Sequence, residues 1–308
     1  MATVNSPAAQ PKSRRGRGTS SGRPLKLRTQ LVLQAVCLFL TFTVLYPIVW
    51  VVARSIDPSA LNRPTSLIPD GATLDAYRAV LTQPTTNPVS FARLALNTIL
   101  LAGGVTIFAL AIGVSAAYAF SRLRFRGREM LMLAVLGVLM LPAVAGIAPL
   151  FVLLNRVVIG GFNLRNSLFG VGLAMTSGAL PFAIWNLKGY LDTIPKELEE
   201  AATIDGATRN QTFVRIVLPL CTPVLAVTAF LVFLGGWTEF YLSWQFLTEP
   251  KNFTLSMALY GMVGQYAGQT PWSRFTAMAL VIALPVAIVY LSLQKYIVGG
   301  LTVGSVKG

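Results

Sequence analysis

Residues 94–121 read LALNTILLAGGVTIFALAIGVSAAYAFS, a stretch without a single charged side chain. A helix needs about 20 apolar residues to cross the roughly 30 Å hydrocarbon core of a bilayer, and this stretch is long enough. Glycines recur within it, at Gly103, Gly104 and Gly113. Such small residues allow helices to pack closely in lipid. The stretch therefore predicts a membrane-spanning helix that belongs to a packed bundle.

Similar apolar stretches lie on both sides of this one, and the composition of the whole chain agrees with them. Of the 308 residues, 54% are apolar and 12% are charged, and the mean hydropathy is +0.65. A soluble globular domain carries about a quarter charged residues, so a soluble enzyme is excluded. We predict an all-α membrane protein with six transmembrane helices, at about 29–53, 94–121, 130–155, 166–187, 221–243 and 275–294.

The basic residues predict how the spans are oriented. Seven Lys and Arg fall in residues 1–28, which we expect to form a disordered cytosolic tail before a transmembrane domain at 29–298. With both termini in the cytosol, the inner segments, including a C-terminal tail at 299–308, hold 17 of the 25 Lys and Arg. This agrees with the positive-inside rule. The net charge of +14 thus indicates contact with the membrane surface rather than nucleic-acid binding.

The loop at 188–220, between the fourth and fifth spans, contains DTIPKELEEAATIDGA at residues 192–207. We expect a short helix at 195–205 here, with Thr193 or Asp192 as its N-terminal cap. Pro195 suits the first turn, and Gly206 predicts a left-handed C-terminal stop. The alanines of this helix leave one face shallow, which suits insertion into a groove on another protein.

The spacing within this loop resembles the EAA loop of bacterial ABC importer permeases: Glu200-Ala201-Ala202, three residues, Gly206, nine residues, Ile216, one residue and Leu218-Pro219. The last nine residues, GLTVGSVKG at 300–308, resemble the tail of MalG-type permeases for maltose and maltodextrin. The resemblance covers roughly residues 29–308. It implies a type I ABC importer permease in the bacterial inner membrane, with a cytosolic EAA coupling helix between spans 4 and 5.

The resemblance also implies partners. These are a second, MalF-like permease subunit, a homodimeric MalK-like cytosolic ATPase and an extracytoplasmic, MalE-like sugar-binding protein. ATP and Mg would be bound by the ATPase, since no G-x-x-x-x-G-K-[ST] motif occurs in this chain. We therefore expect no enzyme activity and no cofactor in this chain.

Two sets of contact residues follow from the same resemblance. The residues implied in coupling to the ATPase are Glu200, Ala201, Ala202, Asp205, Gly206, Leu218, Pro219, Lys307 and Gly308. Those implied in contact with the binding protein lie in a glycine-rich outer segment, at Gly261, Gly264, Gln265, Tyr266 and Gly268.

Sugars are bound by aromatic stacking and polar groups, so a transport pathway should be lined by such side chains. One cluster of this kind comprises Trp237, Thr238, Glu239 and Tyr241, and further candidates are Asn97, Tyr118, Thr176 and Asn186. Glu239 lies at membrane depth, where a carboxylate is a candidate for function. Its alternative role is a hydrogen bond between helices or at headgroup level. The expected substrates are maltose or maltodextrin, with trehalose and related oligosaccharides as alternatives.

Two other functional classes compete with this interpretation. A secondary sugar transporter driven by an ion gradient should show repeated halves and buried ionisable residues, and neither is evident here. A membrane-bound enzyme would need a reactive group of side chains. The chain has no histidine and only two cysteines, Cys37 and Cys221, which leaves a catalytic triad and a Cys/His metal site unsupported.

Overall fold

The computed structural model describes residues 26–58, 67–266 and 269–303. The chain divides into two compact units, 1–48 and 49–308, and helix α1 (Leu27–Ser55) begins in the first and ends in the second. Most of the expected N-terminal tail lies outside the described residues, as do Gly268, Lys307 and Gly308.

The second unit is built of helices and contains one small hairpin. In chain order its elements are α2 (Asp75–Thr82), α3 (Phe91–Arg122), α4 (Arg128–Leu139), η1 (Ala143–Gly146), α5 (Ile147–Arg156), β1 (Val158–Ile159), β2 (Phe162–Asn163), α6 (Leu168–Leu191), α7 (Glu197–Ile204), α8 (Arg209–Thr212), the π-helix η2 (Phe213–Val217), α9 (Leu218–Leu220), α10 (Thr222–Trp237), α11 (Tyr241–Phe246), η3 (Pro250–Asn252), α12 (Leu255–Tyr260) and α13 (Trp272–Val303).

Five helical segments among the described residues are long and apolar enough to cross a membrane: α1, α3, α6, the α10–α11 segment (Thr222–Phe246) and α13. A sixth is obtained if α4 and α5 count as one span. The two halves, Arg128–Leu139 and Val144–Arg156, are bent by 97° at the break between them, which contains Pro142. The sequence predicts a kink in the span expected at 130–155, at Pro142 or Pro149, because proline interrupts the hydrogen bonds of a helix.

The hairpin follows α5. Its strands pair antiparallel, with Val158 opposite Asn163 and Ile159 opposite Phe162. The two-residue turn is Gly160-Gly161, with φ of 55° and 84°. Such left-handed turns match the twist of the strands, and glycine adopts them without steric cost.

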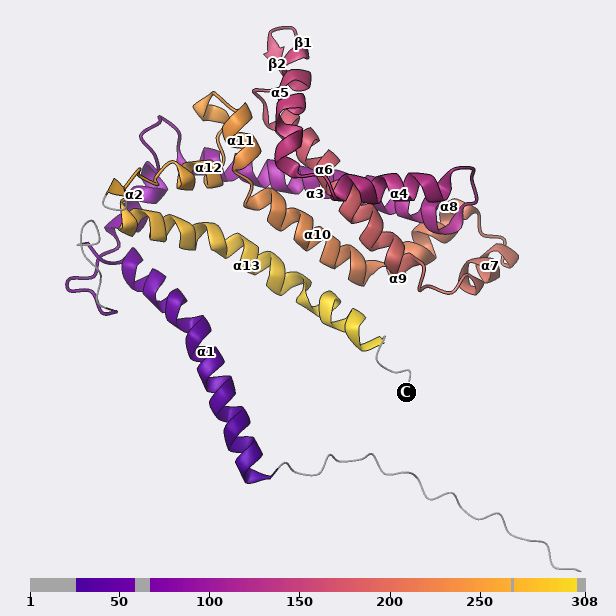
Figure 1. Cartoon of the computed structure of the whole chain (residues 1–308), viewed down its shortest axis with the longest axis horizontal. Helices are drawn as coiled ribbons and strands as arrows, with labels where there is room; N and C mark the ends of the chain where they lie inside the picture. Colours follow the sequence, from indigo (N-terminus) through magenta and orange to yellow (C-terminus); the bar gives the residue numbers. More distant parts are fainter. Residues whose placement is uncertain (1–25, 59–66, 267–268, 304–308) are drawn as a thin grey trace, which may run out of the picture. The chain divides into compact units, whose positions relative to one another are not determined.

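Helix α3 packs against α6 and α10, and α10 also contacts α13 (Figure 1). Small residues set these crossings, as the sequence predicts. A Cβ atom on Gly113 would lie 3.1 Å from the Cβ of Ala183 in α6. One on Gly236 in α10 would lie 2.8 Å from the Cα of Ala102. The backbones therefore meet too closely for a larger residue at Gly236.

Three buried apolar clusters lie along the bundle, and both α3 and α10 contribute to each of them. The first cluster joins these helices to α2, α12 and α13. The third joins them to α6, η2 and Ile194 in the segment before α7. As Figure 1 shows, α2 and α7 lie at opposite ends of the second unit. Helix α3 thus runs from the end that carries α2 to the end that carries α7.

Candidate functional site

Helix α7 begins without a side-chain cap. It starts at Glu197, and its first turn is closed by the backbone N–H groups of Glu199 and Glu200, which donate to the carbonyl of Lys196. The expectation that Thr193 or Asp192 caps this helix is wrong. Thr193 donates instead to the carbonyl of Tyr190, and Asp192 is the C-terminal cap of α6. The connection between α6 and α7 is therefore longer than predicted, since α7 begins at Glu197 and the expected helix began at residue 195.

The C-terminus of α7 has the predicted left-handed stop. Gly206 has φ of +87°. Its N–H donates to the carbonyl of Thr203, and the N–H of Ala207 donates to that of Ala202. This pair of bonds is a Schellman motif. A new helix then starts, because Thr208 and Gln211 form a reciprocal capping box at the start of α8.

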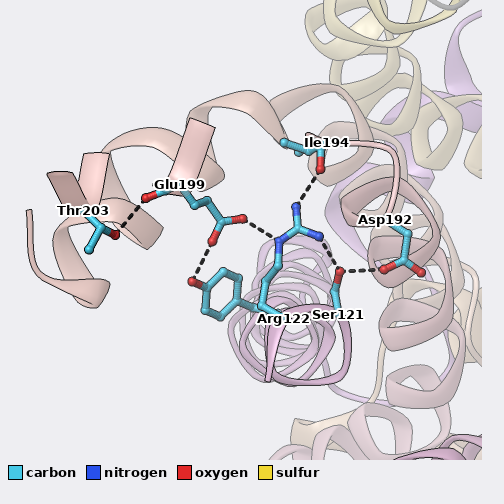
Figure 2. Close-up of polar contacts among 7 residues, drawn as sticks. Ser121, Arg122, Asp192, Ile194, Glu199 and Thr203 are labelled. Atoms are coloured by element: carbon cyan, nitrogen blue, oxygen red, sulfur yellow. Dashed lines mark hydrogen bonds and ion pairs between the residues drawn. The ribbon is translucent and has the colours of Figure 1, made fainter. Parts of the chain in front are cut away.

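One face of α7 is bonded to the end of α3 (Figure 2). The carboxylate of Glu199 accepts from Nε of Arg122 and, at 2.9 Å, from the hydroxyl of Tyr118. Tyr118 and Arg122 are four residues apart and so share a face of α3. The side chains of Arg122 and Glu199 are only 7% and 14% exposed, so this ion pair is shielded from water.

The same guanidinium reaches two further groups. Arg122 donates through Nη2 to the carbonyl of Ile194 at 2.9 Å and through Nη1 to Oγ of Ser121 at 3.0 Å. Ser121 in turn donates to Asp192 at 2.6 Å. We call this group of Tyr118, Ser121, Arg122, Asp192 and Glu199 the α3–α7 junction. It joins α3, the end of α6 and α7 through hydrogen bonds.

Asp192 is also bonded to the Nζ of Lys188 at 2.6 Å. Burial tends to raise the pKa of Asp192. The hydrogen bonds from Lys188 and Ser121, with the positive charges of Lys188 and Arg122, outweigh that effect and hold the pKa below its ordinary value. Asp192 is therefore ionised in the junction at neutral pH.

The opposite face of α7 is open to solvent. Glu197, Glu200, Ala201 and Ile204 lie on it at helical spacing, and all four are exposed. Ile204 has 87% of its surface exposed although it is apolar. Ala202 faces inward and is buried, with 7% of its surface exposed. The expected coupling residues thus divide between a free outer face and a bonded inner face.

The remaining expected coupling residues lie beyond the turn. Asp205 is the exposed C-cap of α7. Leu218 is half-buried against the third apolar cluster. Pro219 is exposed in α9, directly after the π-helix η2. A π-helix inside a helical stretch is rare and frequently marks a functional site.

Residues expected to line a sugar pathway have structural contacts within this chain. Trp237 is 2% exposed, and its Nε1 donates to the carbonyl of Ile282. Thr238 donates to the carbonyl of Leu234. Glu239 caps α11, since its carboxylate accepts from the N–H of Leu242 and from the N–H and hydroxyl of Ser243. Of this cluster, Tyr241 presents its ring most openly, at 43% exposed.

The further pathway candidates are also engaged. Asn97 is buried and donates to the carbonyls of Lys251 and Phe253, which holds the segment before α12. Asn186 donates to the hydroxyl of Thr228 and so links α6 to α10. Thr176 bonds within its own helix. Tyr118 belongs to the α3–α7 junction.

At the other end of the unit, the expected binding-protein contacts border an open cavity of about 1050 Å³. Gly261 and Gly264 line it, together with polar residues of the segment 82–87. Gly264 must be glycine, because a Cβ there would lie 2.5 Å from the Cβ of Gln269. Gln265 and Tyr266 are exposed nearby.

Four residues of the junction are absent from the sequence-based site candidates: Ser121, Arg122, Asp192 and Glu199. Arg122 looks like one more positive-inside residue at the end of an apolar stretch. Glu199 precedes the Glu200 of the motif and shares its chemistry. The available signal was helical spacing, because Glu199 and Ala202 lie three residues apart on one face of α7.

Comparisons with known proteins agree with this architecture. Residues 109–303 match the family described as binding-protein-dependent transport system inner membrane component. The chain is 36% identical to the trehalose/maltose transport system permease protein MalG of Thermococcus litoralis, over 86% of this chain and 92% of the relative. It is 33% identical to the galactooligosaccharides transport system permease protein GanQ of Bacillus subtilis, over 88% and 93%.

Among solved structures, the chain resembles one chain of a bacterial ABC transporter involved in the import of the acidic polysaccharide alginate. The TM-score is 0.71 at 25% sequence identity, covering 87% of this chain and 96% of that one.

Proposed function

This chain belongs to the family of binding-protein-dependent transport system inner membrane components, and from that premise we propose that it couples a cytosolic ATPase to the import of maltose or maltodextrin. It is a multi-pass permease subunit of an ABC sugar importer in the inner membrane. Trehalose and related oligosaccharides are the alternative substrates, in keeping with the transport systems named for its relatives.

The observation that carries the proposal is the two-sided construction of α7. Its outer face holds Glu200, Ala201 and the exposed Ile204, and its inner face is bonded to α3. An isolated helix of eight residues is unstable in water, so this segment is ordered by the bundle behind it. A rigidly presented short helix with small and apolar outer residues suits a groove on a partner protein.

The proposed partner at this face is a homodimeric, MalK-like ATPase that binds ATP and Mg. Glu200 pairs there with a basic group, while Gly206 permits the turn that lets α7 stand out from the bundle. Lys307 and Gly308 reach toward the ATPase dimer from the C-terminal tail. Both termini lie in the cytosol, as the distribution of basic residues favours.

The other half of the pore is a MalF-like second permease. At the outer end, a MalE-like binding protein docks beside Gly261, Gly264, Gln265, Tyr266 and Gly268. Its support is the open cavity that two of these glycines line, at the end of the unit opposite α7. The pathway within this chain passes the exposed ring of Tyr241 and its neighbours Trp237, Thr238 and Glu239.

The test is the substitution Glu200→Lys in the complete importer reconstituted into vesicles with binding protein and sugar. ATP hydrolysis should persist while sugar uptake is lost, because the docked helix keeps its fold and loses its ion pair with the ATPase. Glu129→Lys in α4 makes the same charge change at another exposed helix start and should leave uptake unchanged. Normal uptake by the Glu200→Lys importer would defeat the proposal.

A further inference from the structure

The attachment of α7 to the bundle depends mainly on polar contacts. In α7, Ala202 is the buried residue. A hollow of about 530 Å³ opens beside the helix, between Tyr118, Lys196, Thr203 and Arg209. Little apolar packing therefore holds this helix in place. The ion pair between Glu199 and Arg122 is a charge-assisted hydrogen bond, a kind of contact roughly twice as strong as a neutral hydrogen bond.

Two routes lead from α7 into the membrane. The covalent route follows the chain to α10 and is interrupted three times. It passes the left-handed turn at Gly206, the π-helix η2, and a break at Cys221 between α9 and α10. Each interruption departs from regular α-helical hydrogen bonding, so the covalent route contains no single continuous helix from α7 to α10.

The lateral route is short and continuous. Glu199 bonds directly to Arg122, which ends the unbroken 32-residue helix α3. Tyr118 adds a second bond to the same carboxylate, and its ring packs on Phe213 of η2 at 4.7 Å between centroids. Helix α3 contributes to all three apolar clusters of the bundle, so whatever moves its end moves packed helices.

We propose that Glu199 is a positioning residue that transmits ATPase movement from α7 into α3 through Arg122 and Tyr118. This rests on the proposed function, since it requires that the outer face of α7 is gripped by an ATPase. The adjacent glutamates then have separate tasks. Glu200 engages the partner and Glu199 engages the permease's own bundle.

The experiment measures the coupling ratio, which is the amount of sugar taken up per ATP hydrolysed, in the complete importer in vesicles. Glu199→Gln keeps the size of the side chain and weakens the charge-assisted bond to Arg122. We expect the coupling ratio to fall about tenfold while ATP hydrolysis continues. The exchanged pair, Glu199→Arg with Arg122→Glu, should restore much of the lost ratio, because the contact between the two side chains is needed and not either residue alone.

Tyr118→Phe is the milder variant, because it removes one hydroxyl and keeps the ring against Phe213. It should lower the coupling ratio about threefold. If Glu199→Gln prevents assembly of the importer, the coupling ratio of the Tyr118→Phe importer is the test of the inference. A wild-type coupling ratio in Tyr118→Phe, or in an assembled Glu199→Gln importer, overturns the inference and leaves the proposed function intact. Absence of ATP-dependent uptake by the unmodified importer overturns both.

Discussion

Replacing Arg122 by alanine tests the α3–α7 junction without any partner protein. The substitution leaves the carboxylate of Glu199 without its cation and the carbonyl of Ile194 without its donor. Breaking a buried ion pair by removing one partner costs about 3–5 kcal/mol. The two side chains are 7% and 14% exposed, so little of this is lost to solvent screening.

This free-energy cost destabilises the attachment of α7, which has few other contacts with the bundle. At about 1.4 kcal/mol per factor of ten, the population of the detached helix should rise roughly a hundredfold or more. An eight-residue helix has little stability of its own, so detachment should also unfold it. Its amide protons should then exchange roughly a hundredfold faster than in the unmodified protein, up to the limit set by an unstructured peptide.

The assay is hydrogen–deuterium exchange of the full-length protein in lipid nanodiscs, followed on a peptide covering 194–207. The matched control is Arg124→Ala, which removes the same charge two residues away, from an exposed position. The control should exchange like the unmodified protein, while Arg122→Ala should lose protection. If exchange in Arg122→Ala stays within about twofold of the control, the junction does not hold α7 and the reasoning is refuted.

Two further predictions concern packing and pH. Gly236→Ala should destabilise the bundle by about 1–3 kcal/mol, because its Cβ would lie 2.8 Å from the Cα of Ala102, and a lowered thermal midpoint in detergent would register this. The pKa of Asp192 is depressed in the folded state. The stability that its ionised form gives the fold is therefore complete above the unfolded pKa of about 3.9 and is lost as the pH falls through the folded pKa. Exchange protection at 188–194, corrected for intrinsic rates, should stay constant from pH 8 to about pH 5 and fall only below about pH 4, whereas Asp192→Asn should abolish that fall.

The helical architecture could be predicted from the sequence because it depends on features of short, continuous stretches of the chain. Long uncharged stretches must cross the bilayer as helices, and glycines at Gly113 and Gly236 permit close crossings. The bend between α4 and α5 was predicted only as a proline kink. A bend of 97° depends on how both halves pack against other helices, and no local pattern encodes that.

The candidate site was predictable for its outer face and not for its inner one. The EAA spacing singles out Glu200 and Gly206 as residues that we propose to act in coupling, and the structure places Glu200 on the exposed face of α7. Arg122 and Glu199 are 77 residues apart in sequence. A contact between distant segments leaves no periodicity in either one, and each residue alone has an ordinary explanation.

The register of α7 decides which of the two glutamates lies on the bonded inner face and which on the exposed outer face. Successive helical residues are rotated by about 100°, so the side chains of Glu199 and Glu200 point in different directions, although both border the hollow beside Tyr118. Burial of Ala202 and the Schellman motif at Gly206 fix that register from the C-terminal end. The inner face then falls on Glu199 and Ala202, and the outer face on Glu200 and Ile204. A motif that includes Glu200 but not Glu199 therefore omits the residue that bonds α7 to α3, and this is the contact through which we propose that a docked helix moves the bundle.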